Sequence, residues 1–209
     1  SEDGVQLTWM DAKVGDWVVT PRIGKAVEIN ALWYNALKIM QYLATEFGEE
    51  AGYGAHAKRV FTAFNEQFWN EDLGYLHDLI TPQGPDPAIR PNQLFALSLP
   101  FALLGNQRAQ RTLAVAEEHL LTPRGLRSLS PQNPAHRAHC QGDPWERDDA
   151  YHQGIVWGWL IGPFITALCH VHGEEGRQQS RDLRRRAAVH PTWLHRPGLE
   201  CRRTIACRS

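Results

Sequence analysis

The chain has 209 residues, of which 43% are hydrophobic and 22% charged, and its net charge at neutral pH is −1. This composition suits one globular domain or part of a larger one, and it excludes highly charged disorder. The charge argues against a nucleic-acid binder, and the lack of a long apolar run or signal peptide predicts a cytoplasmic protein without a membrane span. The cysteines follow no metal-ligand spacing and are expected to be reduced thiols: Cys140, Cys169, Cys201 and Cys207.

The first half of the chain predicts a loop followed by two helices. Residues 1–24 contain Gly and Pro at intervals and no helical period, which indicates a loop. From residue 26, apolar side chains recur at spacings of three and four, which predicts a helix over 26–48. A second helix is expected over 51–68. The loop after it is expected to contain a short strand at 75–80.

The second half predicts four more helices, at 91–104, 106–121, 153–172 and from Glu174 onward. Pro91 suits the first turn of its helix, and Pro100 is expected to kink it. The helix over 153–172 is apolar nearly all round and is expected to be buried. Residues 122–150 are rich in Pro and Gly and indicate a long loop, of a length that is usually functional or disordered.

Six helices with little strand predict an all-α protein built from helical hairpins in series. No sequence repeat of fixed period is present, which favours an α/α toroid over a regular solenoid. In such a toroid the loops at one end of a rigid scaffold build the binding pocket. The loops that precede the predicted helices are therefore the place to look for functional residues.

The composition of the chain changes after Leu183. Residues 184–209 contain seven Arg and a single acidic residue, Glu200, and they show no helical stripe beyond their first residues. A basic tail of this kind can bind nucleic acid or an acidic membrane. We interpret the tail instead as a segment that is not native to this fold. The expected division is a domain over 1–183 and an atypical tail over 184–209.

The composition is unusual in its eight tryptophans, five of which lie in or beside the loops before helices: Trp9, Trp17, Trp33, Trp145 and Trp157. Indole rings either fill a core or stack on flat ligand faces. The same loops carry charged groups and a histidine: Asp11, Asp16, Arg22, Glu28, Arg90 and His152. This combination suits a carbohydrate site, because sugar C–H faces pack on rings while hydroxyls need oriented donors and acceptors.

Each of these residues also has a purely structural interpretation. Asp11 could cap a turn, Glu28 could complement the dipole at a helix start, and His152 could be a hydrogen-bonded core histidine. The two His and one Cys within 136–140 lack a fourth ligand, so no metal site is expected there.

A resemblance to a known family covers about residues 4–183. It is carried by the segment LTWMDAKVGDWVVTPRIGKAVEINALWYNAL and then, in order, by RPNQLFALSLP, GLRSLSP and YHQGIVWGWLIGPF. These segments resemble the C-terminal amylo-α-1,6-glucosidase domain of the bacterial and archaeal glycogen debranching enzymes. The resemblance implies an (α/α)6 barrel, of which this chain would supply the second half.

The resemblance also implies an inverting mechanism with two carboxyl groups about 6.5–9.5 Å apart. Asp11 matches the general acid of the family's TWMD motif, and apolar walls around it would favour the protonated acid. The family's base is a Glu in a loop near the C-terminus, for which no match is present, and Glu200 is not assigned that role. The residues expected to bind substrate are Trp9, Arg22, Glu28, Asn30, Trp33, Arg90, Asn92, Gln93, Tyr151, His152, Gln153 and Trp157.

The implied partners are an α-glucan, such as glycogen or a limit dextrin, and the N-terminal half of the same domain. No cofactor, metal, nucleic acid or membrane is expected. Without a base, this chain alone is expected to be weak or inactive as an α-1,6-glucosidase. The alternatives are a non-catalytic α-glucan-binding remnant and another toroid enzyme, such as a trehalase-like hydrolase or an epimerase.

Overall fold

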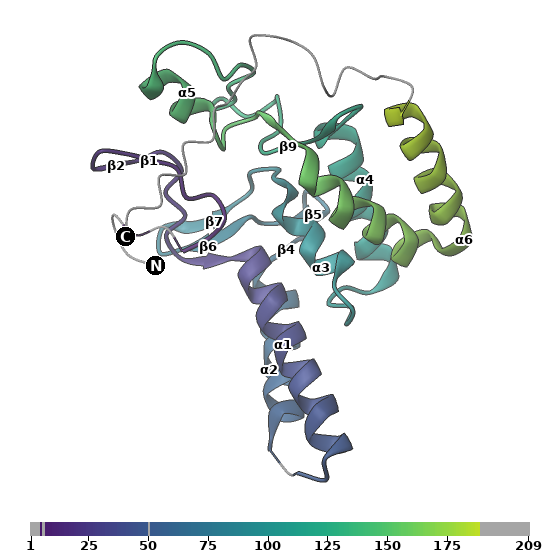
Figure 1. The fold of residues 1–209 in the computed structure, drawn as a ribbon. Helices are drawn as coiled ribbons and strands as arrows, with labels where there is room; N and C mark the ends of the chain where they lie inside the picture. Colours follow the sequence, from purple (N-terminus) through teal and green to yellow (C-terminus); the bar gives the residue numbers. More distant parts are fainter. Residues whose placement is uncertain (1–4, 6, 50, 189–209) are drawn as a thin grey trace, which may run out of the picture.

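Helices make up about half of the chain in the computed structural model, which describes residues 5, 7–49 and 51–188 (Figure 1). The α-helices are α1 (Val27–Glu46), α2 (Tyr53–Gln67), α3 (Phe95–Ser98), α4 (Asn106–Leu120), α5 (Pro144–Ala150) and α6 (Ile161–Ala188). Two short 3-10 helices are η1 (Pro91–Leu94) and η2 (Gly158–Leu160). The predicted helical character is confirmed, but short strands accompany the helices, so the chain is not purely all-α.

The strands form four small sheets, in which every pair of neighbours in the described part of the chain is antiparallel. The sheets are β1 (Lys13–Val14) with β2 (Trp17–Val18); β3 (Lys25–Ala26) with β6 (Leu79–Thr81) and β7 (Gly84–Asp86); β4 (Trp69–Asn70) with β5 (Tyr75–Leu76); and β8 (Leu121–Thr122) with β9 (Gly125–Arg127) and β10 (Val156–Trp157). The predicted strand at 75–80 is present in two pieces, whereas the loop expected over 1–24 contains the β1–β2 hairpin.

α1 and α2 form a hairpin that projects from the rest of the molecule (Figure 1). Gly48 follows α1 with a φ of 71° and Gly52 precedes α2 with a φ of 65°, a backbone conformation that glycine adopts without strain. Ala57 and Phe64 of α2 are buried, and the rings of Tyr34 and Phe61 lie 6.0 Å apart across the hairpin. The two helices predicted for the first half of the chain are thus confirmed.

α1 is apolar on both of its faces. One face is buried through Val27, Ala31, Tyr34 and Leu37. The opposite face is exposed, and it carries apolar side chains at spacings of three and four along the whole helix: Ile29, Leu32, Trp33, Ala36, Ile39, Met40, Leu43 and Phe47. We call this set the α1 stripe. Contiguous apolar surface of this kind marks an interaction face rather than a solvated one.

Two predicted helices differ in the structure. The helix expected to kink at Pro100 instead stops at Ser98, and Leu99 is extended, because a residue that precedes proline is disfavoured in the helical conformation. The helix expected over 153–172 begins only at Ile161, because Val156 and Trp157 pair with β9. The predicted break before Glu174 is a kink inside α6, where Gly173 has a φ of 57°.

The long loop predicted over 122–150 contains two strands and a helix that the periodicity did not indicate. α5 is short, and its start is fixed by a capping box in which Asp143 and Glu146 exchange hydrogen bonds with each other's backbone N–H groups. At the other end of the chain, α6 continues past the predicted boundary at 183. Glu200, Cys201 and Cys207 lie outside the described residues. The Cys140 thiol donates to the Arg147 carbonyl oxygen, and Cys169 is a free thiol.

The core joins α1, η1, α4, η2 and α6 around fully buried side chains such as Leu94, Leu113, Leu126, Leu160 and Phe164. Trp9 and Trp157 pack against this core and η1 is part of it, so the core positions the segments at 9–11, 90–93 and 151–157. Across the part of the chain that the structure describes, no helix has the length and apolar character needed to cross a bilayer.

Candidate active site

Asp11 and His152 lie side by side although 140 positions separate them in sequence. Asp11 Oδ1 is 3.7 Å from His152 Nε2, with the Asp11 side chain 67% exposed and the His152 side chain 1% exposed. Neither ring nitrogen of His152 has a hydrogen-bond partner among the described residues. Burial, opposed by the Asp11 carboxylate, lowers the pKa of His152 to about 4, so its imidazole is neutral at neutral pH.

Aromatic rings surround His152 on several sides. The imidazole stacks on Trp157 with ring centres 5.5 Å apart, and the Tyr151 ring makes T-shaped contacts with both. Trp9 makes edge contacts with His152, Trp157 and Trp159 at 5.1–5.6 Å. Trp9, Tyr151 and Trp157 are half-buried and Trp159 is exposed, so these tryptophans line a surface rather than fill an interior. We call this set, with His152, the aromatic cluster.

A buried ion cluster lies behind this surface. Arg22 donates hydrogen bonds to both carboxylate oxygens of Glu28 and of Asp78, and all three side chains are buried. Burial raises the pKa of Glu28 against the opposing effect of Arg22. Burial also opposes the charge on Arg22, but Asp78 and Glu28 outweigh it and the pKa of Arg22 is raised. All three groups therefore act as a hydrogen-bonded unit.

Asp78 connects this ion cluster to the segment that carries Asp11. Asn92 donates to Asp78 Oδ1 at 2.8 Å, and Trp9 Nε1 donates to Asn92 Oδ1 at 2.7 Å. Between Trp9 and Asp11, the Met10 side chain is 1% exposed, and its sulfur lies 3.7 Å from Asn92 Nδ2. The main chain on the N-terminal side of Asp11 is thus held by one buried side chain and one hydrogen-bonded indole.

Arg90 fixes the opposite wall of the site. Its guanidinium donates to the carbonyl oxygens of His152 at 2.7 Å and Ser128 at 3.1 Å, and to the side-chain oxygen of Gln153 at 2.8 Å. Its Nε lies 3.8 Å from Asp78 Oδ2. Burial lowers the pKa of Arg90, and Asp78 opposes that effect. Arg90 therefore links the segment around His152 to the ion cluster.

The structure places the predicted site residues in three groups. Asp11 and the rings that surround His152 lie at the surface, with buried His152 and half-buried Gln153 beside them. Buried residues behind them make the connecting hydrogen bonds: Arg22, Glu28, Arg90, Asn92 and Gln93. The remaining two lie on α1, where Asn30 donates to the Ala26 carbonyl oxygen and Trp33 belongs to the α1 stripe.

Glu28 is not arranged as the sequence indicated. The prediction placed it among the residues that bind substrate. In the structure Glu28 is 2% exposed and both its oxygens accept hydrogen bonds from Arg22. Such a carboxylate positions other groups and does not face a reacting water.

Sequence reasoning missed Asp78 and Trp159. Asp78 lies between β5 and β6 and is flanked by buried Leu76 and Leu79, a pattern that indicates a buried acid. Trp159 follows Trp157 in the last motif, and its ring lies 5.1 Å from that of Trp9. The spacing of aromatic residues in that motif was the available signal for Trp159.

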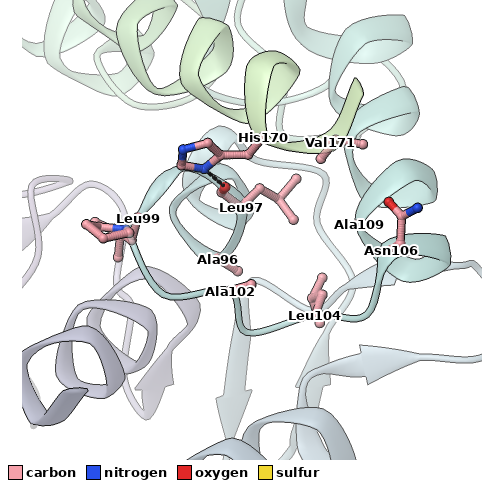
Figure 2. Close-up of a pocket in the computed structure, with 10 residues that line it drawn as sticks. Ala96, Leu97, Leu99, Ala102, Leu104, Asn106, Ala109, His170 and Val171 are labelled. Carbon is pink, nitrogen blue, oxygen red and sulfur yellow. Dashed lines mark hydrogen bonds between the residues drawn. The ribbon is translucent and has the colours of Figure 1, made fainter. Parts of the chain in front are cut away.

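A separate hollow of about 370 Å³ lies between α6 and the segment joining α3 to α4. Its walls are mostly apolar, and at its rim the His170 Nδ1–H donates to the Leu97 carbonyl oxygen at 3.0 Å, as Figure 2 shows. None of the predicted site residues lines it. This hollow therefore lacks the convergent carboxylate, imidazole and indole groups found around Asp11.

Comparison with known proteins agrees with the motifs that build this site. The family model described as amylo-alpha-1,6-glucosidase matches residues 1–200. The chain belongs to this family. Its relatives include the glycogen debranching enzyme of Saccharomyces cerevisiae (strain ATCC 204508 / S288c), which is 27% identical over 209 aligned positions, covering 79% of this chain and 14% of the yeast protein. The chain thus spans only a small part of that relative's length.

Proposed function

We propose that this chain is the Asp11-bearing part of a glucosidase domain that hydrolyses α-1,6-linked glucose on glycogen or a related α-glucan. The observation that carries the proposal is the exposed Asp11 carboxyl group beside neutral, buried His152 and the indoles of the aromatic cluster. An exposed acid beside aromatic faces can meet a glycosidic oxygen while the sugar packs on the rings. Family membership and the yeast relative support the same reaction class.

In this mechanism Asp11 is the general acid. It gives its proton to the glycosidic oxygen as the bond from that oxygen to the anomeric carbon breaks. Water attacks the anomeric carbon from the opposite face, and a second carboxylate accepts the proton of that water, which inverts the configuration. Glu28 and Asp78 are engaged by Arg22, so neither is assigned as this base. The base is therefore expected outside the site described above.

His152 is proposed to orient Asp11. Its ring is held by Trp157, Trp9 and Tyr151, and its backbone carbonyl accepts from Arg90, so Nε2 is fixed where it meets the Asp11 carboxyl group. A neutral imidazole can donate or accept a hydrogen bond without adding charge. It can therefore position Asp11 in both protonation states that general acid catalysis requires.

The proposed domain is the second half of an (α/α)6 toroid over residues 1–183, completed by its own N-terminal half. The α1 stripe supports this proposal, because a helix that is apolar on both faces is typical of one buried between two layers. The exposure of Asp11 supports it as well. The apolar wall expected around the acid is not supplied by the described residues, so the N-terminal half of the domain would have to supply it.

One alternative has an observation in its favour. A non-catalytic α-glucan-binding remnant would keep the aromatic cluster and lack a working acid–base pair. The carboxylates of Glu28 and Asp78 accept hydrogen bonds from Arg22, so neither serves as a base, which favours this alternative. A trehalase-like hydrolase or an epimerase remains a weaker proposal, because His152 is the only histidine that the described contacts place beside Asp11.

Product analysis on a branched limit dextrin separates these proposals. The 209-residue chain is incubated with the dextrin, alone and together with the N-terminal half of its domain. The proposed function predicts free glucose only when both halves are present. An isomerised sugar would indicate an epimerase, and binding without any product from the combined halves would indicate a remnant.

A further inference from the structure

Two tryptophans outside the aromatic cluster stack on each other at the surface. The rings of Trp17 and Trp145 lie 4.8 Å apart at an angle of 16°. Trp145 remains 52% exposed although Trp17 covers one of its faces. Because Trp17 stacks on one face of Trp145, the exposed surface of Trp145 belongs to its other face, its ring edge and its backbone. We call this pair the tryptophan platform.

Both sides of the platform are firmly anchored. Trp17 begins β2, which pairs with β1, and the Val19 N–H donates to the Ala12 carbonyl oxygen beside that pair. Trp145 lies in the first turn of α5, whose start is fixed by the capping box. Contacts between α5 and β1 hold the two elements together. The platform is therefore a preformed surface, which lowers the entropic cost of binding a ligand.

The same two segments also build the Asp11 site. The β1–β2 hairpin begins two residues after Asp11, and α5 ends immediately before Tyr151 and His152. At the helical rise, six positions from Trp145 to Tyr151 correspond to about 9 Å. This span exceeds a single sugar ring, so a ligand that touches both places has to be a chain of sugars.

The surroundings of the platform favour a sugar over an apolar protein partner. Exposed charged residues lie close to the two rings in sequence: Lys13, Asp16, Glu146 and Arg147. A protein interface core is depleted of charge and apolar over a contiguous area, as the α1 stripe is. Isolated aromatic faces between polar groups instead match a carbohydrate, whose C–H faces pack on rings while its hydroxyls meet polar neighbours.

We propose that Trp17 and Trp145 form a binding subsite for the linear α-1,4-glucan chain that carries the branch. This inference rests on the proposed function, because it assigns to the platform the part of the substrate that leaves with the oxygen protonated by Asp11. The platform would hold that chain while the branch sugar reaches the aromatic cluster. It would then supply affinity for long substrates and little for a single glucose unit.

The test titrates maltoheptaose, a linear α-1,4-glucan, into the full 209-residue chain while NMR follows each indole Nε1–H signal. The expected result is a saturable shift of the Trp17 and Trp145 signals. Trp145→Ala should weaken binding about tenfold, the loss expected for one aromatic stacking contact. Trp145→Phe should keep the ring contact and much of the affinity. Tyr42→Ala, which removes a 58% exposed ring on α1, should bind like the wild type.

Unshifted Trp17 and Trp145 signals, or equal affinity in Trp145→Ala, would overturn the proposal. Equal binding of cellohexaose, a β-1,4-glucan, would overturn its assignment to α-glucans. A parallel titration with isomaltose, an α-1,6 disaccharide, tests the proposed function separately through the Trp9 and Trp157 signals. If isomaltose shifts the Trp9 and Trp157 signals but maltoheptaose leaves the Trp17 and Trp145 signals unshifted, the platform proposal fails while the proposed function stands. If maltoheptaose shifts the Trp17 and Trp145 signals but isomaltose leaves the Trp9 and Trp157 signals unshifted, the proposed function fails while the platform still binds an α-glucan.

Discussion

Asp78 contributes more to this structure than its place in the short link between β5 and β6 suggests. Its two oxygens accept hydrogen bonds from Arg22 and Asn92, and through Asn92 it reaches the indole that precedes Asp11. Arg90, on the other wall, lies 3.8 Å from the same carboxylate. One buried acid thus joins both segments of the candidate site, and its removal would leave buried cations short of a partner.

Asp78→Asn is expected to destabilise the chain by about 3 kcal/mol, because it leaves buried positive charge uncompensated. Urea unfolding followed by circular dichroism measures this loss. The control is Glu71→Gln, which removes an ion pair to Arg108 whose Glu71 side chain is 71% exposed, and it should change little. Equal midpoints for both variants would contradict the role given to Asp78.

The depressed pKa of His152 predicts a pH-dependent stability. Burial lowers that pKa to about 4, below the unfolded value of about 6.5. The unfolded chain therefore binds the proton first, so the contribution is fully present above pH 6.5 and is lost as the pH falls toward 4. The loss amounts to about 3 kcal/mol.

Urea unfolding at several pH values, with His152→Phe as the comparison, measures the contribution of His152. Burial also lowers the pKa of His77 and His136, so the wild-type curve contains their contributions as well. The difference between the two proteins isolates His152. Parallel curves between pH 4 and 6.5 would show that its imidazole is not held neutral by burial.

The close pairing of strands β3 and β6 depends on Gly24, which immediately precedes β3. This residue has a φ of 124°, and a Cβ built on it would lie 2.3 Å from the Ile80 carbonyl oxygen. β3 in turn leads into α1 and the ion cluster behind the candidate site. A side chain at this position would push the two strands apart.

Gly24→Ala is therefore expected to destabilise the chain more than Gly84→Ala does. Gly84 has nearly the same φ, 129°, but a Cβ there would have no neighbour within 4 Å. Both variants pay the conformational strain, about 1–3 kcal/mol, and only Gly24→Ala adds a backbone clash. Thermal unfolding of the two variants measures the difference, and equal melting temperatures would show that the clash is relieved without cost.

Local patterns predicted the helices well and the strands poorly. α1, α2 and α4 follow from apolar spacing within one segment, and so their existence and approximate ends were predictable. The residues around Trp157 read as a helix because their pairing partner in β9 lies about thirty positions earlier, where no periodicity shows it. The hydrogen bonds of Asp78 were not predictable for the same reason, since its partners Arg22 and Asn92 lie 56 and 14 positions away in sequence.

The α1 stripe determines how whole molecules of this chain interact with one another. Its exposed apolar side chains should make the isolated chain associate through α1. Met40→Glu, in the middle of the stripe, is expected to lower the sedimentation coefficient to that of a monomer. Tyr42→Glu, on the same helix but outside the stripe, should not. A wild-type chain that sediments as a monomer at high concentration would contradict the interaction role of the stripe.

Glucose release from a branched limit dextrin by the two combined halves of the domain tests the role of Asp11 most directly. Asp11→Asn should lower the rate at least about 10²-fold, because a general acid contributes that much, while the dextrin still binds. The 209-residue chain alone should release no glucose above background. An undiminished rate with Asp11→Asn, or clear glucose release by this chain alone, would contradict the account of the acid and of the missing base.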